Sequence, residues 1–204
     1  MDKLNFRIEL DNILTPSRET LFDWYNSKHN ASYDFNKVKE HDLLIIFNIQ
    51  RPELIKNMQE FYNSDEFRLI KPYEEAVELI KIIKPFSNLN IVVERPNIKM
   101  LDSISFIEEY FGKLKNTRFT NPYDPKSVGL TKNTWDNEWK IDLVVEHVLS
   151  EAMQAKEDRR HVILLNKPYN QSEEVGGIIR VNDHKEMLEK IMDYRNIGEN
   201  EKSL

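Results

Sequence analysis

The sequence predicts an α/β fold in which helices flank a mainly parallel sheet. Short apolar runs alternate along the chain with stretches of helical periodicity, and strands separated by helices run parallel through right-handed crossovers. The chain has 204 residues, of which 40% are hydrophobic, so we expect one compact domain with its own core. Polar residues follow several of the apolar runs, and sites in such folds form beyond the carboxyl ends of the strands.

The expected elements follow from these two periods in chain order. Residues 5–10 predict a strand, because apolar and polar side chains alternate there. Thr15 and Pro16 favour a helix start, since proline suits the first helical turn. Further strands are expected at residues 90–93, 118–120, 141–145, 161–165 and 178–181, and helices at 16–28, from 52, at 73–84, at 103–111 and from a cap at Asp183 to about 194.

Composition and charge exclude several classes of function. The chain has no cysteine, which excludes a thiol nucleophile and cysteine-ligated metal sites. Its formal net charge of −6 argues against broad nucleic-acid binding, which needs a basic face. Its apolar stretches are too short for a membrane-spanning helix or a signal peptide. We therefore expect a cytoplasmic protein that does not bind membranes.

Charged residues follow the predicted strands at the points where a parallel sheet would bring them together. Carboxylates that converge on one edge can hold a cation, and a lysine beside them can neutralise phosphate charge. This combination is what phosphoryl chemistry with Mg²⁺ requires. The residues concerned are Glu9, Asp11, Glu94, Arg95, Lys132, Glu146 and His147.

The order and spacing of these residues resemble the haloacid dehalogenase superfamily, and within it the 5′(3′)-deoxyribonucleotidase-like families. The resemblance covers nearly the whole chain. Residues 9–14, Glu-Leu-Asp-Asn-Ile-Leu, are similar to the family's Asp-x-Asp-Gly-x-Leu, and residues 93–96, Val-Glu-Arg-Pro, to its Thr-Ser-Arg-Pro. Lys132 falls at the third-motif lysine, and Glu146 with His147 at an Asp-Asp pair. Similar segments also lie at residues 66–72, 119–123, 166–170 and 179–181.

The resemblance implies an architecture and a set of site residues. It implies a core of residues 1–15 and 73–197, a helical cap at 16–72 inserted after the first strand, and we expect a flexible tail at 198–204. It implies the following roles: Glu9, Asp11 and Lys132 as catalytic residues, Val93, Glu94 and Arg95 as the substrate-binding segment, and Glu9, Asp11 and Glu146 as ligands of Mg²⁺.

Two departures from the family pattern affect the chemistry directly. Glu9 stands where the family has the aspartate that attacks phosphorus, and the extra methylene displaces the carboxylate by about 1 Å, which can cost ~100-fold in rate. Val93 stands where the family has a hydroxyl residue, and losing one such donor typically costs ~100- to 1,000-fold. Asp11 keeps the position of the acid and base.

Two further departures concern the cation and the turn. His147 replaces a carboxylate, and a neutral imidazole suits Mg²⁺ poorly. Asn12 replaces the usual glycine in a tight turn. We therefore expect Mg²⁺ to bind weakly and ordinary phosphatase turnover to be lost or very slow.

Three functions stay open on the sequence alone. The leading hypothesis is a catalytically degenerate nucleotidase homologue that acts by binding a nucleotide, a phosphate ligand or a protein partner. The second is an active Mg²⁺-dependent phosphomonoesterase with Glu9 as nucleophile. The third is a purely structural or regulatory interaction protein. The sequence does not decide whether the chain forms a homodimer.

Overall fold

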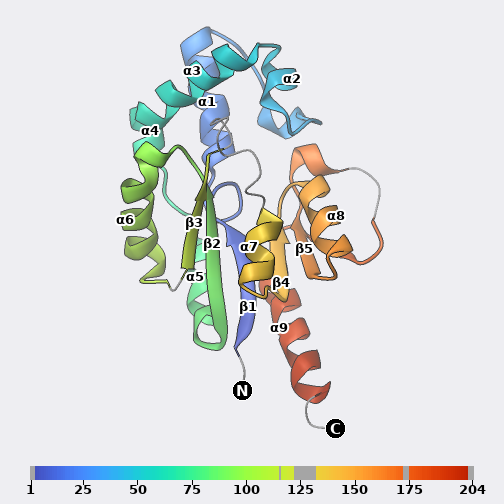
Figure 1. Ribbon diagram of the computed structural model, residues 1–204. Coiled ribbons are helices and arrows are strands. Elements are labelled where there is room, and N and C mark those ends of the chain that lie inside the picture. Colours follow the sequence, from blue (N-terminus) through green and yellow to red (C-terminus); the bar gives the residue numbers. More distant parts are fainter. Residues whose placement is uncertain (1–2, 115, 122–131, 172–174, 202–204) are drawn as a thin grey trace.

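The centre of the molecule is a six-stranded sheet in which all neighbouring strands are parallel. A computed structural model describes residues 3–114, 116–121, 132–171 and 175–201. The strand order is β3-β2-β1-β4-β5-β6, so the first strand lies at the centre (Figure 1). The strands are β1 (Leu4–Glu9), β2 (Ser87–Glu94), β3 (Asn116–Thr120), β4 (Leu143–Glu146), β5 (His161–Leu165) and β6 (Ile178–Val181).

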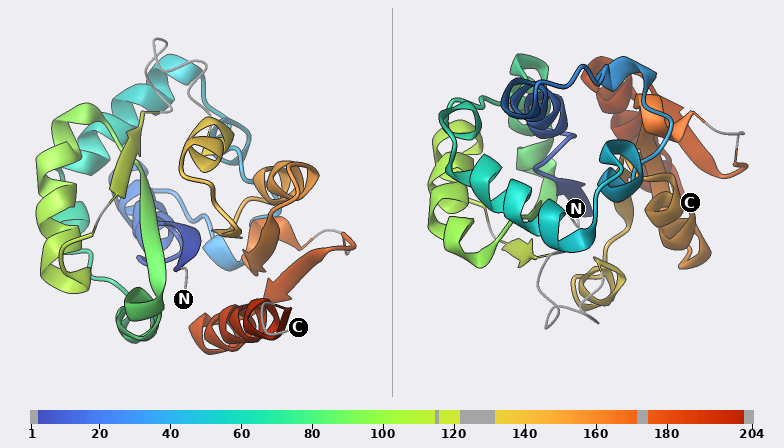
Figure 2. Two further views of the ribbon diagram at one scale, coloured as in Figure 1. Left: turned by 60° about the horizontal axis from the view of Figure 1, so that its bottom comes forward. Right: turned by 90° about the horizontal axis from the view of Figure 1, so that it is seen from above.

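Helices connect the strands and cover both faces of the sheet (Figure 2). The α-helices are α1 (Ser17–His29), α2 (Leu43–Phe47), α3 (Arg51–Asn63), α4 (Asp65–Arg68), α5 (Glu74–Ile83), α6 (Met100–Phe111), α7 (Lys132–Glu138), α8 (Leu149–Glu157) and α9 (His184–Glu201). Short 3₁₀ turns lie at Phe35–Lys37, Lys84–Phe86, Asn97–Lys99 and Pro168–Asn170. The α/β fold with a parallel sheet flanked by helices is confirmed.

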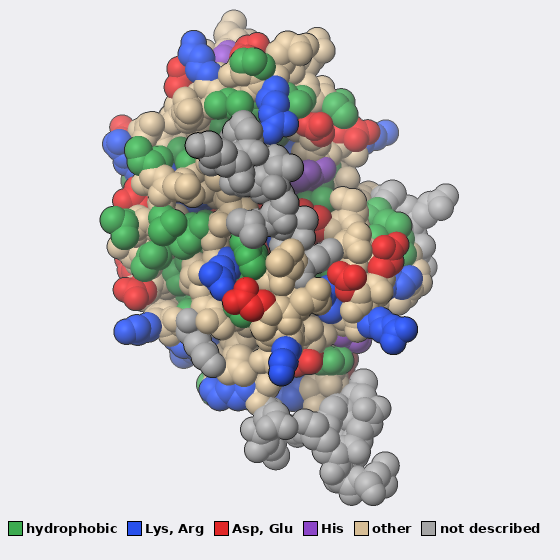
Figure 3. Space-filling model, in the orientation of Figure 1, with side chains coloured by type: hydrophobic (Ala, Val, Ile, Leu, Met, Phe, Trp, Pro, Cys, Tyr) green, Lys and Arg blue, Asp and Glu red, His purple; other side chains and the backbone are tan. Residues whose placement is uncertain are grey.

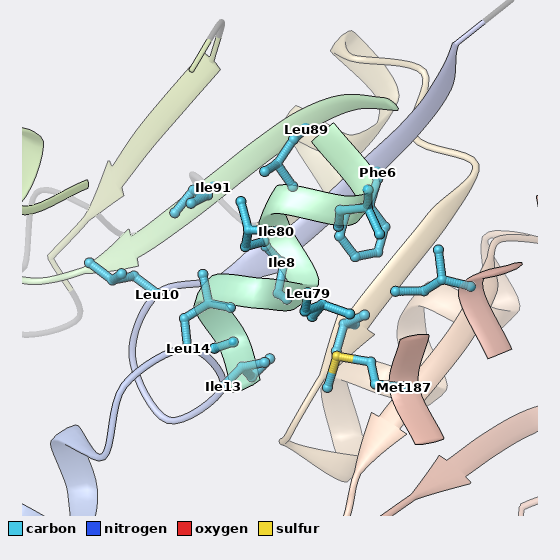
Figure 4. Close-up of a cluster of buried hydrophobic side chains, with 14 of the residues drawn as sticks. Phe6, Ile8, Leu10, Ile13, Leu14, Leu79, Ile80, Leu89, Ile91 and Met187 are labelled. Atoms are coloured by element: carbon cyan, nitrogen blue, oxygen red, sulfur yellow. The ribbon is translucent and has the colours of Figure 1, made fainter. Parts of the chain in front are cut away.

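The two faces of the sheet differ in what they bury. Alternate residues of the strands pack against α5, α6 and α9 in the main apolar core, part of which Figure 4 shows. Phe6, Ile8 and Leu10 lie on this face, so Arg7 and Glu9 lie on the other. That other face is covered by α8, whose Ala152 and Ala155 pack in a smaller cluster, and it carries the charged site.

The helices α1–α4 lie beyond the carboxyl ends of the strands (Figure 1). They have a buried apolar cluster of their own, separate from the core of the sheet. Its members are Leu21, Phe22, Trp24, Tyr25, Leu43, Phe47, Leu54, Met58, Phe61, Tyr62, Phe67 and Ile70. The division into cap and core at residues 16 and 72 stays a prediction, but the aromatic side chains here do pack together, as core residues do.

Several boundaries differ from those expected. The last helix, α9, begins after Asp183, whose Oδ1 accepts a hydrogen bond from Glu186 N, and it continues to Glu201 rather than ending near residue 194. It therefore includes residues 198–201 of the expected tail. The short helix α2 was not predicted, because a five-residue apolar run does not show helical periodicity. Asp42 caps it, since its Oδ1 accepts from Leu44 N.

The surface shows no broad basic field on the face of Figure 3, where acidic and basic side chains are interspersed. Among the described helices, none combines the length and the apolar character that a membrane crossing needs. Residues 122–123 of the segment expected after the third strand lie outside the described residues.

Candidate functional site

Three glutamates end three neighbouring strands. Glu9 is the last residue of β1, Glu94 of β2 and Glu146 of β4. Because these strands are parallel and adjacent, their ends lie at the same edge of the sheet. The alternation of side chains along a strand also explains why Glu9 is on the face opposite to the main core. The sequence pattern therefore places three carboxyl groups at one edge.

Lys132 lies among these carboxylates, at the start of α7. Its Nζ contacts Glu9 Oε1 directly and is 3.3 Å from Glu94 Oε1 and 4.0 Å from Glu146 Oε2. It is also 2.5 Å from Oε2 of Glu151, in the first turn of α8. The Lys132 side chain is only 8% exposed, so it is held inside the site and not on the surface. The predicted meeting of Glu9, Lys132 and Glu146 is present.

A second buried cation lies beneath this group. Arg7 is fully buried on β1, with Nη2 2.5 Å from Glu146 Oε1 and Nε 2.7 Å from Asp136 Oδ1. Asp136 belongs to α7, the same helix as Lys132, so Arg7 ties this helix to the central strand. A buried cation with two carboxylate partners is strongly held, because removing either partner would leave a buried charge uncompensated.

Glu9 is also held from its other side by an imidazole. His147 Nε2 is 2.8 Å from Glu9 Oε2, and His147 Nδ1 is 2.8 Å from the hydroxyl of Tyr169. Burial lowers the pKa of His147 well below its ordinary value, and Lys132 lowers that pKa further, so the ring is neutral near pH 7. A neutral ring that donates from Nε2 to Glu9 and accepts the Tyr169 hydroxyl at Nδ1 satisfies both contacts.

Asp11 lies in a different set of contacts. Its carboxylate accepts from Arg95, with Nη2 2.7 Å from Oδ1 and Nε 3.0 Å from Oδ2, and from Ser17 Oγ at 2.6 Å. Arg95 in turn donates from Nη1 to Ser103 Oγ at 3.1 Å and lies over the ring of Phe67 at 4.8 Å. Both oxygens of Asp11 are thus engaged by groups of the chain itself.

A cavity of about 380 Å³ opens beside Asp11, between the strand ends and the helices above them. Its floor is polar, and its roof is apolar and comes from α1, α2 and α3. The polar lining consists of Asp11, Asn12, Ser17, Arg18, His41, Asp42 and Glu94, and the apolar lining of Leu21, Leu43, Leu54, Met58, Phe61 and Tyr62. A cavity of this size and mixed lining suits a small organic ligand.

The carboxyl groups of the site differ in how easily they ionise. Burial and the negative charges of Glu151 and Glu146 raise the pKa of Glu94 to about 8. Its 3.3 Å contact with Lys132 does not offset this, because Glu9 and Glu151 lie closer to the same ammonium. Burial would raise the pKa of Glu151, but the Lys132 ammonium outweighs it and the pKa is lowered.

Three carboxylates could hold a divalent cation together. One oxygen from each of Glu9, Glu146 and Glu151 lies within 4.8 Å of the others, and we call these residues the acid cluster. Oε2 of Glu146 is buried without a hydrogen-bond partner among the described residues and has lone pairs to offer, whereas Glu9 Oε1 contacts Lys132 and Glu146 Oε1 pairs with Arg7. Carboxylate oxygens are the donors that Mg²⁺ prefers, and the acid cluster therefore fits such an ion.

The structure gathers some of the expected site residues and separates others. Glu9, Lys132 and Glu146 meet, whereas Asp11 lies outside the acid cluster and binds Arg95. We expected Val93 beside the ligand, but its side chain is fully buried in the main core, on the opposite face.

Sequence reasoning missed several residues of the site, among them Arg7, Glu151 and Tyr169. Glu151 follows Glu146 by five residues in the first turn of the next helix, and that spacing was a usable signal. Arg7 occupies an ordinary polar position of an alternating strand, and its burial depends on Asp136, far away in the sequence. Tyr169 comes from the turn at Pro168–Asn170, inside the segment 166–170 that the resemblance includes without assigning a role to this residue.

The fold is shared with solved structures of phosphatases and related hydrolases. No protein-family model and no curated protein matches this sequence. A predicted phosphatase from Clostridium acetobutylicum has a TM-score of 0.67 and 14% identity, over 95% of this chain and 100% of that chain. A haloacid dehalogenase-like hydrolase from Streptococcus pneumoniae has a TM-score of 0.64 and 11% identity, over 93% and 98%.

A third structure agrees with these two. A phosphatase of the same type from Thermococcus onnurineus has a TM-score of 0.53 and 11% identity, over 92% of this chain and 97% of that chain. At such low identity the likeness concerns the fold and not the chemistry. This chain therefore has the haloacid dehalogenase-like fold, with its charged residues gathered at the strand ends where ligands of such sheets bind.

Proposed function

We propose that this chain is a phosphatase homologue that binds a nucleotide or a similar small phosphate ester beneath α1–α4 and hydrolyses it very slowly or not at all. The fold supports a phosphatase ancestry, and the cavity supports a small ligand. Membership of the deoxyribonucleotidase-like families is a finer part of this proposal, and a protein partner is the alternative to a nucleotide as the bound ligand.

The observation that carries the proposal is the engagement of both acidic residues of the first motif. Glu9 contacts Lys132 through Oε1 and His147 through Oε2, so a nucleophilic oxygen would have to leave one of these partners before it could attack. Asp11 is held bidentately by Arg95. A general acid must face the leaving group to which it transfers a proton, whereas the carboxylate of Asp11 faces the guanidinium of Arg95.

The lining of the cavity supports a nucleotide as the ligand. Met58, Phe61 and Tyr62 offer an apolar wall against which a base or another flat group can pack. Arg18 lines the same cavity, and its guanidinium can pair with phosphate oxygens. When bound, Mg²⁺ at the acid cluster would neutralise phosphate charge. The chain's own residues bind and orient the ligand.

Calorimetric titration with deoxyribonucleoside monophosphates tests this function. We expect saturable binding, and we expect Arg18→Gln to weaken it by about tenfold, because a charge-assisted hydrogen bond to phosphate contributes roughly 1.5–3 kcal/mol. Arg68→Gln is the matched control, since Arg68 is 62% exposed and neither it nor its partner Asp65 lines the cavity. Absence of any heat of binding with nucleotide, phosphate or Mg²⁺ would favour a purely structural protein instead.

A working phosphomonoesterase is the second candidate, and the meeting of Glu9, Lys132 and Glu146 favours it. These groups are the ones that phosphoryl transfer would use, and Lys132 is in contact with the nucleophile position. This function predicts that Glu9→Asp raises phosphate release and that Glu9→Gln abolishes it. If neither change alters the rate, the second candidate is wrong.

A further inference from the structure

We propose that Lys132 is a resident cation of the acid cluster, held where a divalent ion would bind, so that such an ion enters only when the ammonium moves out. The inference stands on the geometry of the acid cluster and does not depend on whether the protein turns over a substrate. It concerns what the site holds at rest.

The position of the ammonium carries the first step. Lys132 Nζ contacts Glu9 Oε1 and lies 2.5 Å from Glu151 Oε2, and these two residues are members of the acid cluster. Mg²⁺ binds carboxylate oxygens at about 2.0–2.1 Å, so an ion shared by the same oxygens would lie within a few ångströms of Nζ. Two cations at that separation repel strongly in a buried site.

Burial makes this arrangement stable in the absence of a metal ion. The side chains of Lys132, Glu9 and Glu146 are at most 8% exposed, so water screens their charges poorly. The Nζ of Lys132 lies within 4.0 Å of a carboxylate oxygen of every member of the acid cluster, and of Glu94 as well. A lysine with this many carboxylate partners replaces part of the charge that a metal ion would otherwise supply.

Arg7 strengthens the same effect from below. Its Nη2 lies 2.5 Å from Glu146 Oε1, and because Arg7 is fully buried on the central strand it cannot move away. Each member of the acid cluster is therefore already paired with a cation of the chain, Glu146 with Arg7 and both Glu9 and Glu151 with Lys132. An entering Mg²⁺ must compete with these ion pairs for the carboxylate oxygens.

His147 completes the occupation of Glu9. Its Nε2 lies 2.8 Å from Glu9 Oε2, the oxygen that Lys132 does not contact. A metal ion that binds Glu9 must therefore compete with a nitrogen on either oxygen. Glu151 is the member with the most freedom, because its side chain is 38% exposed.

Calorimetric titration of the substrate-free protein with Mn²⁺ and with Mg²⁺ tests the inference. Lys132→Met removes the ammonium and keeps the length of the side chain, and we expect it to lower the Kd for Mn²⁺ by about tenfold or more. Adding Glu151→Gln to this variant should reverse the gain. Lys167→Met is the matched control, because Lys167 also pairs with a glutamate, Glu19, at 3.1 Å but lies outside the acid cluster.

Two results would overturn the inference. One is a folded Lys132→Met protein, checked by circular dichroism, that binds Mn²⁺ no more tightly than the wild type. The other is rapid acetylation of Lys132 in the wild-type protein without metal, measured by peptide mass spectrometry. This measurement does not require the variant to fold. We expect Lys132 to react at least about tenfold more slowly than the exposed Lys190 without metal, because a buried, ion-paired ammonium reacts poorly.

The labelling has two supporting patterns and two contrary ones. A resident cation is supported if Lys132 is protected from acetylation and loses this protection as Mn²⁺ binds. It is also supported if the protection persists and calorimetry detects no Mn²⁺ binding. Rapid acetylation without metal, or unchanged protection while Mn²⁺ binds, contradicts it. Failure of nucleotide binding in the Arg18 experiment would leave this result untouched, so the two proposals fail separately.

Discussion

Glu94 is the residue whose ionisation should respond most clearly to pH. Its pKa is raised to about 8 by burial and by the carboxylates around it, from an ordinary value of 4.5. The folded state therefore prefers the protonated form. The resulting stabilisation is fully present below pH 4.5 and is lost as the pH rises through about 8.

Glu94→Gln should remove this pH dependence. We expect the variant to match the wild type near the ordinary pKa and to be more stable above pH 8 by about 1 kcal/mol, or about 2–4 °C in Tm for a chain of this size. The expected difference in stability is small because the Glu94 side chain is 33% exposed and solvent screens its charge. Thermal unfolding across pH measures the difference, with exposed Glu78→Gln as control. Parallel curves for wild type and Glu94→Gln would refute the assignment.

Asn12 shows how a residue other than glycine is tolerated in a tight turn. Its φ of 66° lies in the left-handed region, which favours glycine, but asparagine adopts it more readily than most residues. Its side chain lies 3.4 Å from His147 Nε2. The sequence predicted a tight turn here, and the backbone has it.

At the scale of elements, the Asp11–Arg95 pair joins four segments. Asp11 follows β1, Arg95 follows β2, and Arg95 also contacts Ser103 of α6 and Phe67 of α4. The pair therefore links the strand ends to the helices on either side of them. Its side chains are 5% and 12% exposed, so the ion pair is largely buried.

Arg95→Met should destabilise the fold more than an exposed pair would. Removing one partner of a buried ion pair leaves the other uncompensated, so we expect a loss of about 3–5 kcal/mol, and Asp11→Asn in the same chain should restore a large part of it. Urea unfolding of the wild type, both single variants and the double variant measures the coupling. A loss below about 1 kcal/mol, typical of exposed ion pairs, would show that the link is weak.

The elements also show what local sequence can and cannot predict. The strand His161–Leu165 was predicted with its observed bounds, because a buried parallel strand is a continuous apolar run. The strand Ser87–Glu94 begins three residues earlier than expected, since Asn88 and Asn90 make it look polar. Asn90 Nδ2 donates to Phe6 O and Asn88 O, so tertiary partners permit a polar residue in the sheet.

For the whole molecule, the fold was more predictable than the site. The alternation of strands and helices determines a parallel sheet, and the sheet brings Glu9, Glu94 and Glu146 to one edge. What the side chains do at that edge depends on long-range partners. The resemblance placed Lys132 among the carboxylates, but Arg95 takes Asp11, and that pairing has no signature in local sequence.

Under the proposed function, groups of the chain itself occupy the carboxylate oxygens of Glu9 and Asp11 that hydrolysis would need. Phosphate release from deoxyribonucleoside monophosphates at saturating Mg²⁺ tests it most directly, with Asp11→Asn as the reference. We predict that the wild type releases phosphate no faster than this variant. Turnover on the order of 1–10 s⁻¹ that Asp11→Asn abolishes would be ordinary enzyme catalysis and would contradict the claim.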